Sequence, residues 1–255
     1  MTNSKLSNEE QKQKEYYNSI AKTYDNYYAS SPALRYRYGI YHRILSGMDL
    51  SGSIVLEAMC GGGQTTEFFL KMGATVFAQD ISEEQLNYYR IRYPDADIRC
   101  ESVLKMSYPD NTFDLVSTDS LHHVHANLSI AVEEILRVLK PGGYLLVWEP
   151  AANSFVDKLR RIWYRNDPKY FTSDEAAIDI DVLVGKFSGR LKPIRVHYGG
   201  NFAYFFVHGA MLFRMPHKLV QFYAPVMGAL ENVLDRLTIS QRVPAWVLAL
   251  LRKSK

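Results

Sequence analysis

The sequence has few cysteines and no long apolar run, and these scarcities exclude several classes of protein. Its 255 residues include two cysteines, Cys60 and Cys100, which are too few for a disulfide framework. Neither has a second sulfur or a clustered histidine at the spacing of a metal site, so we predict no metal. Because no window of about 18 uncharged apolar residues occurs, we predict no membrane-spanning helix.

The N-terminus lacks the apolar segment of a secretory signal, so we expect a cytoplasmic protein. The chain also lacks a strong overall charge, since 30 Lys/Arg and 27 Asp/Glu leave a net charge of +3. Proteins that bind nucleic acid through the whole chain usually carry a stronger positive field. With 47% hydrophobic and 13% aromatic residues, the composition is typical of one large folded domain.

The charge is unevenly distributed along the chain. Residues 1–150 carry 14 Lys/Arg and 19 Asp/Glu, a net charge of −5, whereas residues 151–255 carry 16 and 8, a net charge of +8. Two ordinary solvated surfaces would explain this difference. Alternatively, the C-terminal part contacts an anionic partner, such as a phosphorylated substrate or a lipid surface.

The first fifty residues predict two helices. Residues 5–28 and 33–45 have helical periodicity, and Ser30-Ser31-Pro32 marks the turn between them. Each predicted helix carries an aromatic stripe, which ordinarily packs on a core. The stripe of the first helix consists of Tyr16, Tyr17, Ile20 and Tyr24.

From residue 53 the pattern alternates between strand and helix, which favours a parallel sheet with helices on both faces. We predict helices over 64–72, after Ser82 and over 128–139. Ser82 and Gln85 have capping-box spacing, and the third helix should stop at Lys140-Pro141-Gly142-Gly143. The predicted strands are 53–57, 74–79, 97–101, 113–117 and 144–148.

A glycine loop follows the first of these strands, within Val55-Leu56-Glu57-Ala58-Met59-Cys60-Gly61-Gly62-Gly63. Glycines let a ligand approach the backbone, and the N–H groups of the next helix point to the same place. Asp80, at the end of the second strand, is positioned to bind the hydroxyls of a ribose. We therefore predict a nucleoside-containing cofactor. A dehydrogenase is disfavoured because residues 61–66 lack the third glycine of G-x-G-x-x-G.

The C-terminal part differs in character. A basic amphipathic helix is predicted over 154–164, with Phe155, Leu159 and Ile162 on one face. Residues 202–237 are apolar and aromatic but interrupted, which predicts two or three cap helices. The other predicted elements are a helix over 173–187 and strands over 194–198 and 245–251.

Five blocks of this sequence, in order, resemble the type 11 group of class I S-adenosylmethionine (SAM)-dependent methyltransferases. The resemblance implies an α/β fold with a doubly wound, Rossmann-like sheet of seven strands, the last one antiparallel. It implies one integrated domain, in which residues 1–52 form a helical lid, 53–150 the SAM-binding core, and 151–255 the rest of the sheet with a helical substrate cap. The blocks are Val55–Gly63, Phe77–Ser82, Met106–Val116, Ser120–Val124 and Arg137–Gly143.

The resemblance also implies roles for residues that bind SAM. Met59 stands where the family has its first glycine, and Ser102 replaces a common aspartate, so both positions depart from the pattern. The implied positions are Glu57, Gly61 and Gly63 around the methionine part, Asp80 at the ribose, Ile81 on the adenine, Ser102 and Val103 beside the adenine amine, Thr118 and Asp119 near the sulfonium, and Tyr24 closing over the cofactor.

Methyl transfer from a sulfonium depends mostly on alignment, and an acceptor with a proton to lose also needs a base. His122 and His123 follow the fourth strand, and Glu149 ends the fifth. One of the histidines could be the base, with Glu149 orienting it or touching the acceptor. Alternatively, the pair only supports the loop.

No N-P-P-Y-type motif follows the fourth strand, which argues against nitrogen acceptors in nucleic acid. The aromatic cap favours an apolar or ring-shaped acceptor, and its basic neighbours favour an anionic one. The cap could equally be ordinary packing or a homodimer interface. Our leading hypothesis is O-methyl transfer to a natural product, a glycan or a lipid-like compound. The alternatives are a membrane-docking lipid N-methyltransferase and a non-catalytic protein with the SAM fold.

Overall fold

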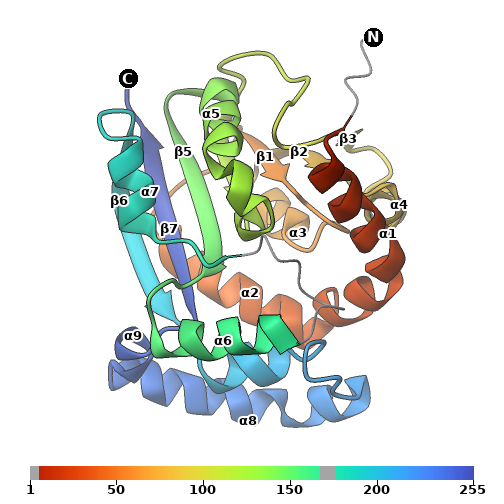
Figure 1. The fold of residues 1–255 in the computed structure, drawn as a ribbon, viewed down its shortest axis with the longest axis vertical. Coiled ribbons are helices and arrows are strands. Elements are labelled where there is room, and N and C mark those ends of the chain that lie inside the picture. Colours follow the sequence, from red (N-terminus) through yellow and green to blue (C-terminus); the bar gives the residue numbers. More distant parts are fainter. Residues whose placement is uncertain (1–5, 167–175) are drawn as a thin grey trace.

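The computed structural model describes residues 6–166 and 176–255, which form a seven-stranded sheet flanked by helices (Figure 1). The strand order is β3-β2-β1-β4-β5-β7-β6, and β7 is antiparallel to both of its neighbours. The predicted fold class is therefore confirmed. The strands are β1 (Ile54–Ala58), β2 (Thr75–Asp80), β3 (Asp97–Cys100), β4 (Phe113–Thr118), β5 (Leu139–Pro150), β6 (Leu191–Gly199) and β7 (Trp246–Lys253).

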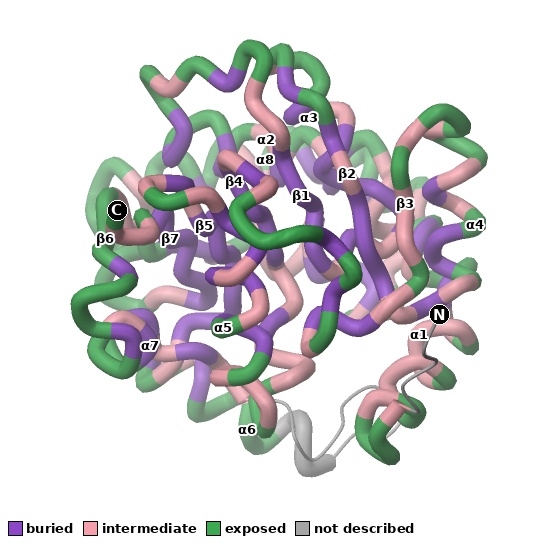
Figure 2. Tube along the Cα trace, turned by 90° about the horizontal axis from the view of Figure 1, so that it is seen from above, coloured by how far each residue is buried: buried purple, intermediate pink, exposed green. Residues whose placement is uncertain are grey.

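The central strands are buried on both faces, as parallel strands covered by helices on each side must be. In β7 the six residues from Trp246 to Leu251 are all buried, and in β4 only Asp114 is partly accessible. Figure 2 shows that most residues along β1, β2 and β4 are buried. This burial explains why these strands read as apolar runs without alternation.

Three helices cover one face of the sheet and two cover the other. On the first face, Ile40, Tyr41 and Ile44 of the second helix pack with Val55 and other strand residues. On the second face, the fifth and seventh helices pack against β4, β5 and β7. The first set is α2 (Ser31–Ile44), α3 (Thr66–Lys71) and α4 (Glu83–Arg92), and the second is α5 (Leu128–Val138) and α7 (Ile180–Lys186).

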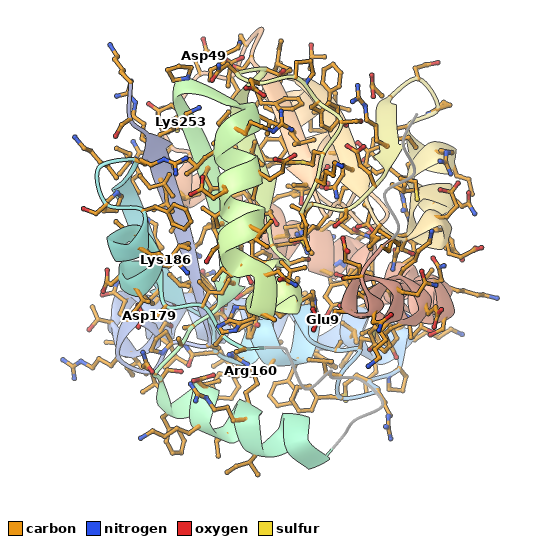
Figure 3. All side chains as sticks on the ribbon, turned by 45° about the horizontal axis from the view of Figure 1, so that its top comes forward. Glu9, Asp49, Arg160, Asp179, Lys186 and Lys253 are labelled. Carbon is orange, nitrogen blue, oxygen red and sulfur yellow. The ribbon has the colours of Figure 1, made fainter. Side chains whose placement is uncertain are left out.

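The remaining helices gather near the carboxyl ends of the parallel strands (Figure 1). The first of them starts at a complete capping box between Ser7 and Glu10 and runs along α4. Figure 3 places Glu9 and Arg160 at this end of the molecule, opposite Asp49 and Lys253. These helices are α1 (Asn8–Tyr28), the 3₁₀ helix η1 (Leu121–Asn127), α6 (Phe155–Asn166), the π-helix η2 (Tyr204–His208), α8 (His217–Arg236) and α9 (Ile239–Arg242).

Three local predictions were wrong in part. The helix before Lys140-Pro141-Gly142-Gly143 ends at Val138, within one residue of the prediction, but the segment itself belongs to β5, and Leu139 already pairs with Phe113 of β4. Its cation does not cap the helix: Lys140 Nζ lies 2.8 and 2.9 Å from the carboxylate oxygens of Asp114.

The capping box predicted at α4 is only half formed. Ser82 Oγ accepts from the backbone N–H of Gln85, but the amide of Gln85 is buried with no hydrogen-bond partner among the described residues. The helix predicted over 173–187 begins instead at Ile180, and its first residues lie outside the described part of the chain. Among the helices described, none is long and apolar enough to cross a membrane.

Candidate active site

The loop after β1 is tied to the tip of β2. Gly61 N–H donates to Asp80 Oδ2 at 2.9 Å, and Ser82 N–H donates to Asp80 Oδ1 at 2.8 Å. Burial raises the pKa of Asp80 above its usual value, although these backbone donors favour the ionised form. The carboxylate therefore has a fixed orientation against the glycine loop.

Met59 occupies a backbone conformation that usually selects glycine. Its φ is 55°, in the left-handed region, which costs an ordinary residue about 1–2 kcal/mol. Its N–H donates to Gln79 Oε1 at 2.9 Å, so the loop keeps a tie to β2. Met59 lines the cofactor cavity, which is described below.

Gly63 is required for packing against the aromatic rings of α4. Its φ is 81°, and a Cβ at this position would lie 2.8 Å from the Tyr89 ring. None of the three cavities described below is lined by Gly63. The structure thus gives no support to its predicted place beside the cofactor.

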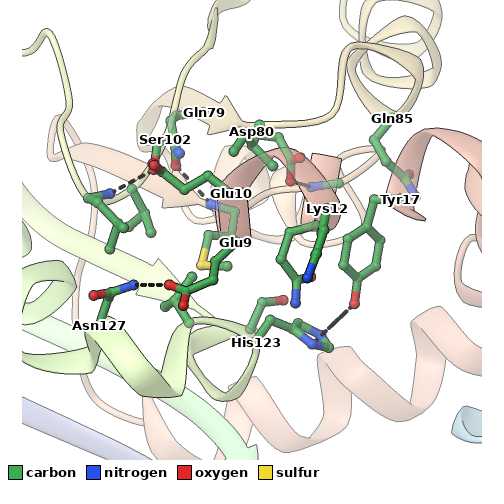
Figure 4. A pocket seen from close by; sticks show the side chains of 18 of the residues that line it. Glu9, Glu10, Lys12, Tyr17, Gln79, Asp80, Gln85, Ser102, His123 and Asn127 are labelled. Carbon is green, nitrogen blue, oxygen red and sulfur yellow. Dashed lines mark hydrogen bonds between the residues drawn. The ribbon is translucent and has the colours of Figure 1, made fainter. Parts of the chain in front are cut away.

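The largest part of the predicted cofactor site lines one cavity of about 130 Å³, which we call the cofactor cavity (Figure 4). Residues of α1, which was predicted as a lid, cover it. Glu9 and Glu10 were not singled out: Glu9 accepts from Asn127 Nδ2 at 3.2 Å, and Glu10 lines the cavity. No motif in the sequence marks these two glutamates as cavity residues. The predicted residues that line the cavity are Tyr24, Met59, Gly61, Asp80, Ile81, Ser102 and Val103.

The other predicted cofactor residues surround a smaller pocket of about 10 Å³ beside the loop. Glu57 lines this pocket but turns to the start of α3, where its carboxylate accepts from Thr65 N–H at 3.1 Å and from the Thr66 hydroxyl. Burial raises the pKa of Glu57 to about 7. Thr118 and Asp119 line the same pocket.

Arg37, which the sequence did not single out, forms a buried ion pair with Asp119. Its guanidinium also donates to Thr65 Oγ1 at 3.2 Å and lies 5.0 Å from the centre of the Trp148 ring. Three buried polar atoms around this pocket have no hydrogen-bond partner within the described ranges. They are Arg37 Nε, Thr118 Oγ1 and Gln64 Nε2.

A third and wider cavity of about 510 Å³ adjoins the other two, and we call it the acceptor cavity. Its lining is rich in aromatic rings and comes from α1, α2, η1, α6, η2 and the ends of β4 and β5. Rings that line it include Tyr28, Trp148, Tyr204, Phe213 and His208.

His122, His123 and Glu149 come together at the acceptor cavity. His122 Nδ1 lies 2.6 Å from Glu149 Oε2, and Leu121 N–H donates to Glu149 Oε1 at 2.7 Å. Burial raises the pKa of Glu149 to about 8. The rings of His122 and His123 lie 3.8 Å apart, and the Tyr17 hydroxyl lies 2.7 Å from His123 Nε2 (Figure 4).

Four residues line both the cofactor cavity and the acceptor cavity, and so mark where the two spaces meet. They are Tyr17, Tyr24, Ser120 and His123. His122 and Glu149 line only the acceptor cavity. The arrangement can therefore hold two molecules whose reacting ends face each other at His123.

The sheet order, the antiparallel β7, the glycine loop and the carboxylate at the tip of β2 define a Rossmann-like class I methyltransferase fold. Residues 56–147 match the family described as a methyltransferase domain. Over residues 56–147 the chain therefore matches the methyltransferase domain, and the predicted resemblance to class I SAM-dependent methyltransferases is confirmed for this part.

Individual relatives agree on the class but differ in substrate. A fatty-acid O-methyltransferase of Mycolicibacterium smegmatis is 29% identical over 116 residues, which cover 44% of this chain and 42% of that protein. The chain thus matches less than half the length of this relative.

Solved structures with the same fold cover nearly the whole chain. The N-methyltransferase NodS of Bradyrhizobium japonicum, solved with S-adenosylhomocysteine (SAH), has a TM-score of 0.59 at 15% identity, with 98% of this chain and 100% of that one covered. The [4+2]-cyclase SpnF has a TM-score of 0.58 at 21% identity, with 87% and 81% covered. At such identities the fold is shared, and the reaction must be argued from the site.

Proposed function

We propose that this protein binds SAM in the cofactor cavity and transfers its methyl group to a small molecule in the acceptor cavity. The observation that carries this proposal is the meeting of the two cavities at Tyr17, Tyr24, Ser120 and His123. Methyl transfer requires two molecules aligned end to end with water excluded, and such a junction supplies that arrangement.

The residues around the loop fit the chemical parts of SAM. Asp80, oriented by two backbone N–H groups, suits a ribose diol. The unsatisfied donors Arg37 Nε and Gln64 Nε2 suit a carboxylate, and Thr118 Oγ1 suits an ammonium group. Buried polar atoms without partners are costly, so a ligand that satisfies three of them gains binding energy.

When bound, SAM supplies a methyl group on a sulfonium that is already activated for displacement. We propose that the acceptor is a hydroxyl on a natural product, a glycan intermediate or a lipid-like compound. One imidazole of the His122–His123 pair takes the hydroxyl proton as the new O–C bond forms. His123 lies at the junction, and Glu149 holds the adjacent His122 ring in place.

Binding is tested by calorimetry with SAM and SAH on the wild type and on Asp80→Asn. Removing the charged acceptor for the ribose should weaken binding of both ligands about tenfold or more. Asp97→Asn on β3, an exposed aspartate that lines none of the three cavities, is the matched control and should bind as the wild type does. If neither SAM nor SAH binds the wild type, the alternative of a non-catalytic protein with the SAM fold is favoured.

The base is tested by His122→Ala and His123→Ala, with turnover of SAM measured in a panel of hydroxylated acceptors. At least one variant should lose most of its turnover while binding SAM normally. His197→Ala, on the outer strand β6, is the control. If both variants keep most of the wild-type rate, neither histidine is the base.

A second candidate is N-methyl transfer to a lipid headgroup by a protein docked on a membrane. The supporting observation is α6, where Phe155, Leu159 and Ile162 are 64%, 51% and 50% exposed beside the basic Lys158 and Arg161. Flotation with vesicles rich in phosphatidylglycerol tests it. Ile162 lies outside the acceptor cavity, so Ile162→Glu should abolish flotation only if α6 docks. Absence of flotation of the wild type at low salt excludes this candidate.

A further inference from the structure

The charged groups that line the acceptor cavity do not balance one another. Among the described residues they are Arg37, Asp119, Glu149 and Arg160. Arg37 and Asp119 neutralise each other in their ion pair, and Glu149 is hydrogen-bonded to His122. Arg160 is thus the charged group of the cavity lining whose positive charge no other lining residue neutralises.

Arg160 is held rigidly against the body of the protein. Its Nη2 donates to the backbone carbonyl of Ala245, just before β7, at 2.7 Å, and its side chain is 10% exposed. Figure 3 shows it at the end of the molecule where the helices gather. An arginine fixed by one of its terminal nitrogens presents the other in a constant direction.

The carboxylate nearest to Arg160 is already engaged elsewhere. Arg160 Nη1 lies 3.5 Å from Asp157 Oδ1 and makes no hydrogen bond within the described part of the chain. The other oxygen of Asp157 accepts from Arg161 Nε and Nη2, at 3.0 and 2.8 Å. One carboxylate therefore serves two guanidinium groups, and one positive charge is left over. Arg161 is 65% exposed and does not line the cavity, so water solvates its charge.

We propose that the acceptor is a monocarboxylate with an apolar or aromatic body, and that Arg160 Nη1 binds its carboxylate. One uncompensated guanidinium matches one negative charge, and its planar N–H groups match a carboxylate. The aromatic lining contacts the rest of the molecule. His208 Nδ1, buried without a partner among the residues described, offers a second polar contact.

The carboxylate serves as a handle in this arrangement and does not receive the methyl group. Arg160 lines the acceptor cavity only, whereas the junction with the cofactor cavity is formed by other residues. An anchored carboxylate leaves a different atom of the same molecule at the junction. The assignment of this cavity to the acceptor rests on the proposed function, but carboxylate binding does not require turnover.

The test compares 2-naphthoate with 2-naphthalenemethanol, two ligands with one ring system that differ in charge. Calorimetry on the full chain gives both dissociation constants, without SAM. The wild type should prefer the acid by about tenfold or more, the effect of a hydrogen bond to a buried charge. Arg160→Met should abolish this preference. Arg161→Met frees Asp157 to pair with Arg160 and should reduce the preference. Lys158→Met, which removes an exposed cation of α6 that lines none of the three cavities, is the control and should keep the preference within about twofold.

Several outcomes would overturn the proposal. These are equal binding of acid and alcohol by the wild type, no binding of either ligand, a preference that survives Arg160→Met, or an equal loss in Lys158→Met. If Arg160→Met does not fold, Arg160→Lys replaces it and should show a reduced preference, because the charge remains and the planar contact is lost. Loss of SAM binding with an intact acid preference would count against the proposed function alone.

Discussion

Replacing Glu149 with glutamine is expected to change how the stability of this protein depends on pH. Burial raises the pKa of Glu149 from 4.5 to about 8, so the folded protein keeps a proton that the unfolded chain releases. The stability contributed by this group is complete below its unfolded pKa and is lost as the pH rises to about 8.

The size of this change in stability follows from the single proton that Glu149 holds in the folded protein. A proton held only in the folded state lowers the free energy of unfolding by about 1.4 kcal/mol for each pH unit gained. The cleanest interval is about pH 6.5 to 8, which starts at the pKa of an unfolded histidine; the histidines are the same in both proteins, so their titration largely cancels in the comparison. Across it the wild type should lose about 2 kcal/mol more than Glu149→Gln does.

Urea unfolding followed by tryptophan fluorescence, at several pH values in this interval, measures the difference. Glu57 also has a raised pKa, but it is present in both proteins and its effect cancels. Glu57→Gln is a useful control because its effect should end near its pKa of about 7. Parallel curves for the wild type and Glu149→Gln would refute the reasoning, since Glu149 would then be ionised when folded.

Two further substitutions test the loop and the ion pair. Gly63→Ala should cost about 1–3 kcal/mol more than Gly47→Ala, because both have positive φ but only Gly63 faces a ring at 2.8 Å; equal free energies of unfolding would contradict this. Asp119→Asn should cost about 3–5 kcal/mol because it leaves Arg37 charged and buried, and adding Arg37→Met should recover part of the loss in thermal unfolding. No recovery would show that the ion pair is not the cause.

The strands and the cofactor loop could be predicted because they depend on short stretches of sequence. Apolar runs without alternation, such as 245–251, are typical of strands buried on both faces, and this strand was found within about two residues. Asp80 was placed at the tip of the second strand because a carboxylate there has a recurring geometry, and its contact with a ribose stays a prediction. The extent of strands was less reliable, since residues 140–143, predicted only to stop a helix, belong to β5.

The acceptor side could not be read in the same way, because its residues come from distant parts of the chain. Arg37 and Asp119 are 82 positions apart, and Tyr17 and His123 are 106 apart, so no local pattern joins either pair. The resemblance predicted a helical lid over the cofactor, but no local pattern in α1 showed which of its other side chains line the cavity. Only packing of the chain reveals these contacts.

By itself, the sequence determined the class of the fold and the loop that suits a nucleoside, since periodicity and glycine placement act over a few residues. Tertiary structure decided which charges remain unpaired. Arg37 and Arg160 are both arginines in a basic, aromatic context, yet one is neutralised by Asp119 and the other shares its carboxylate with Arg161. Ion pairing depends on distances of a few ångströms between distant residues, and these exist only in the folded chain.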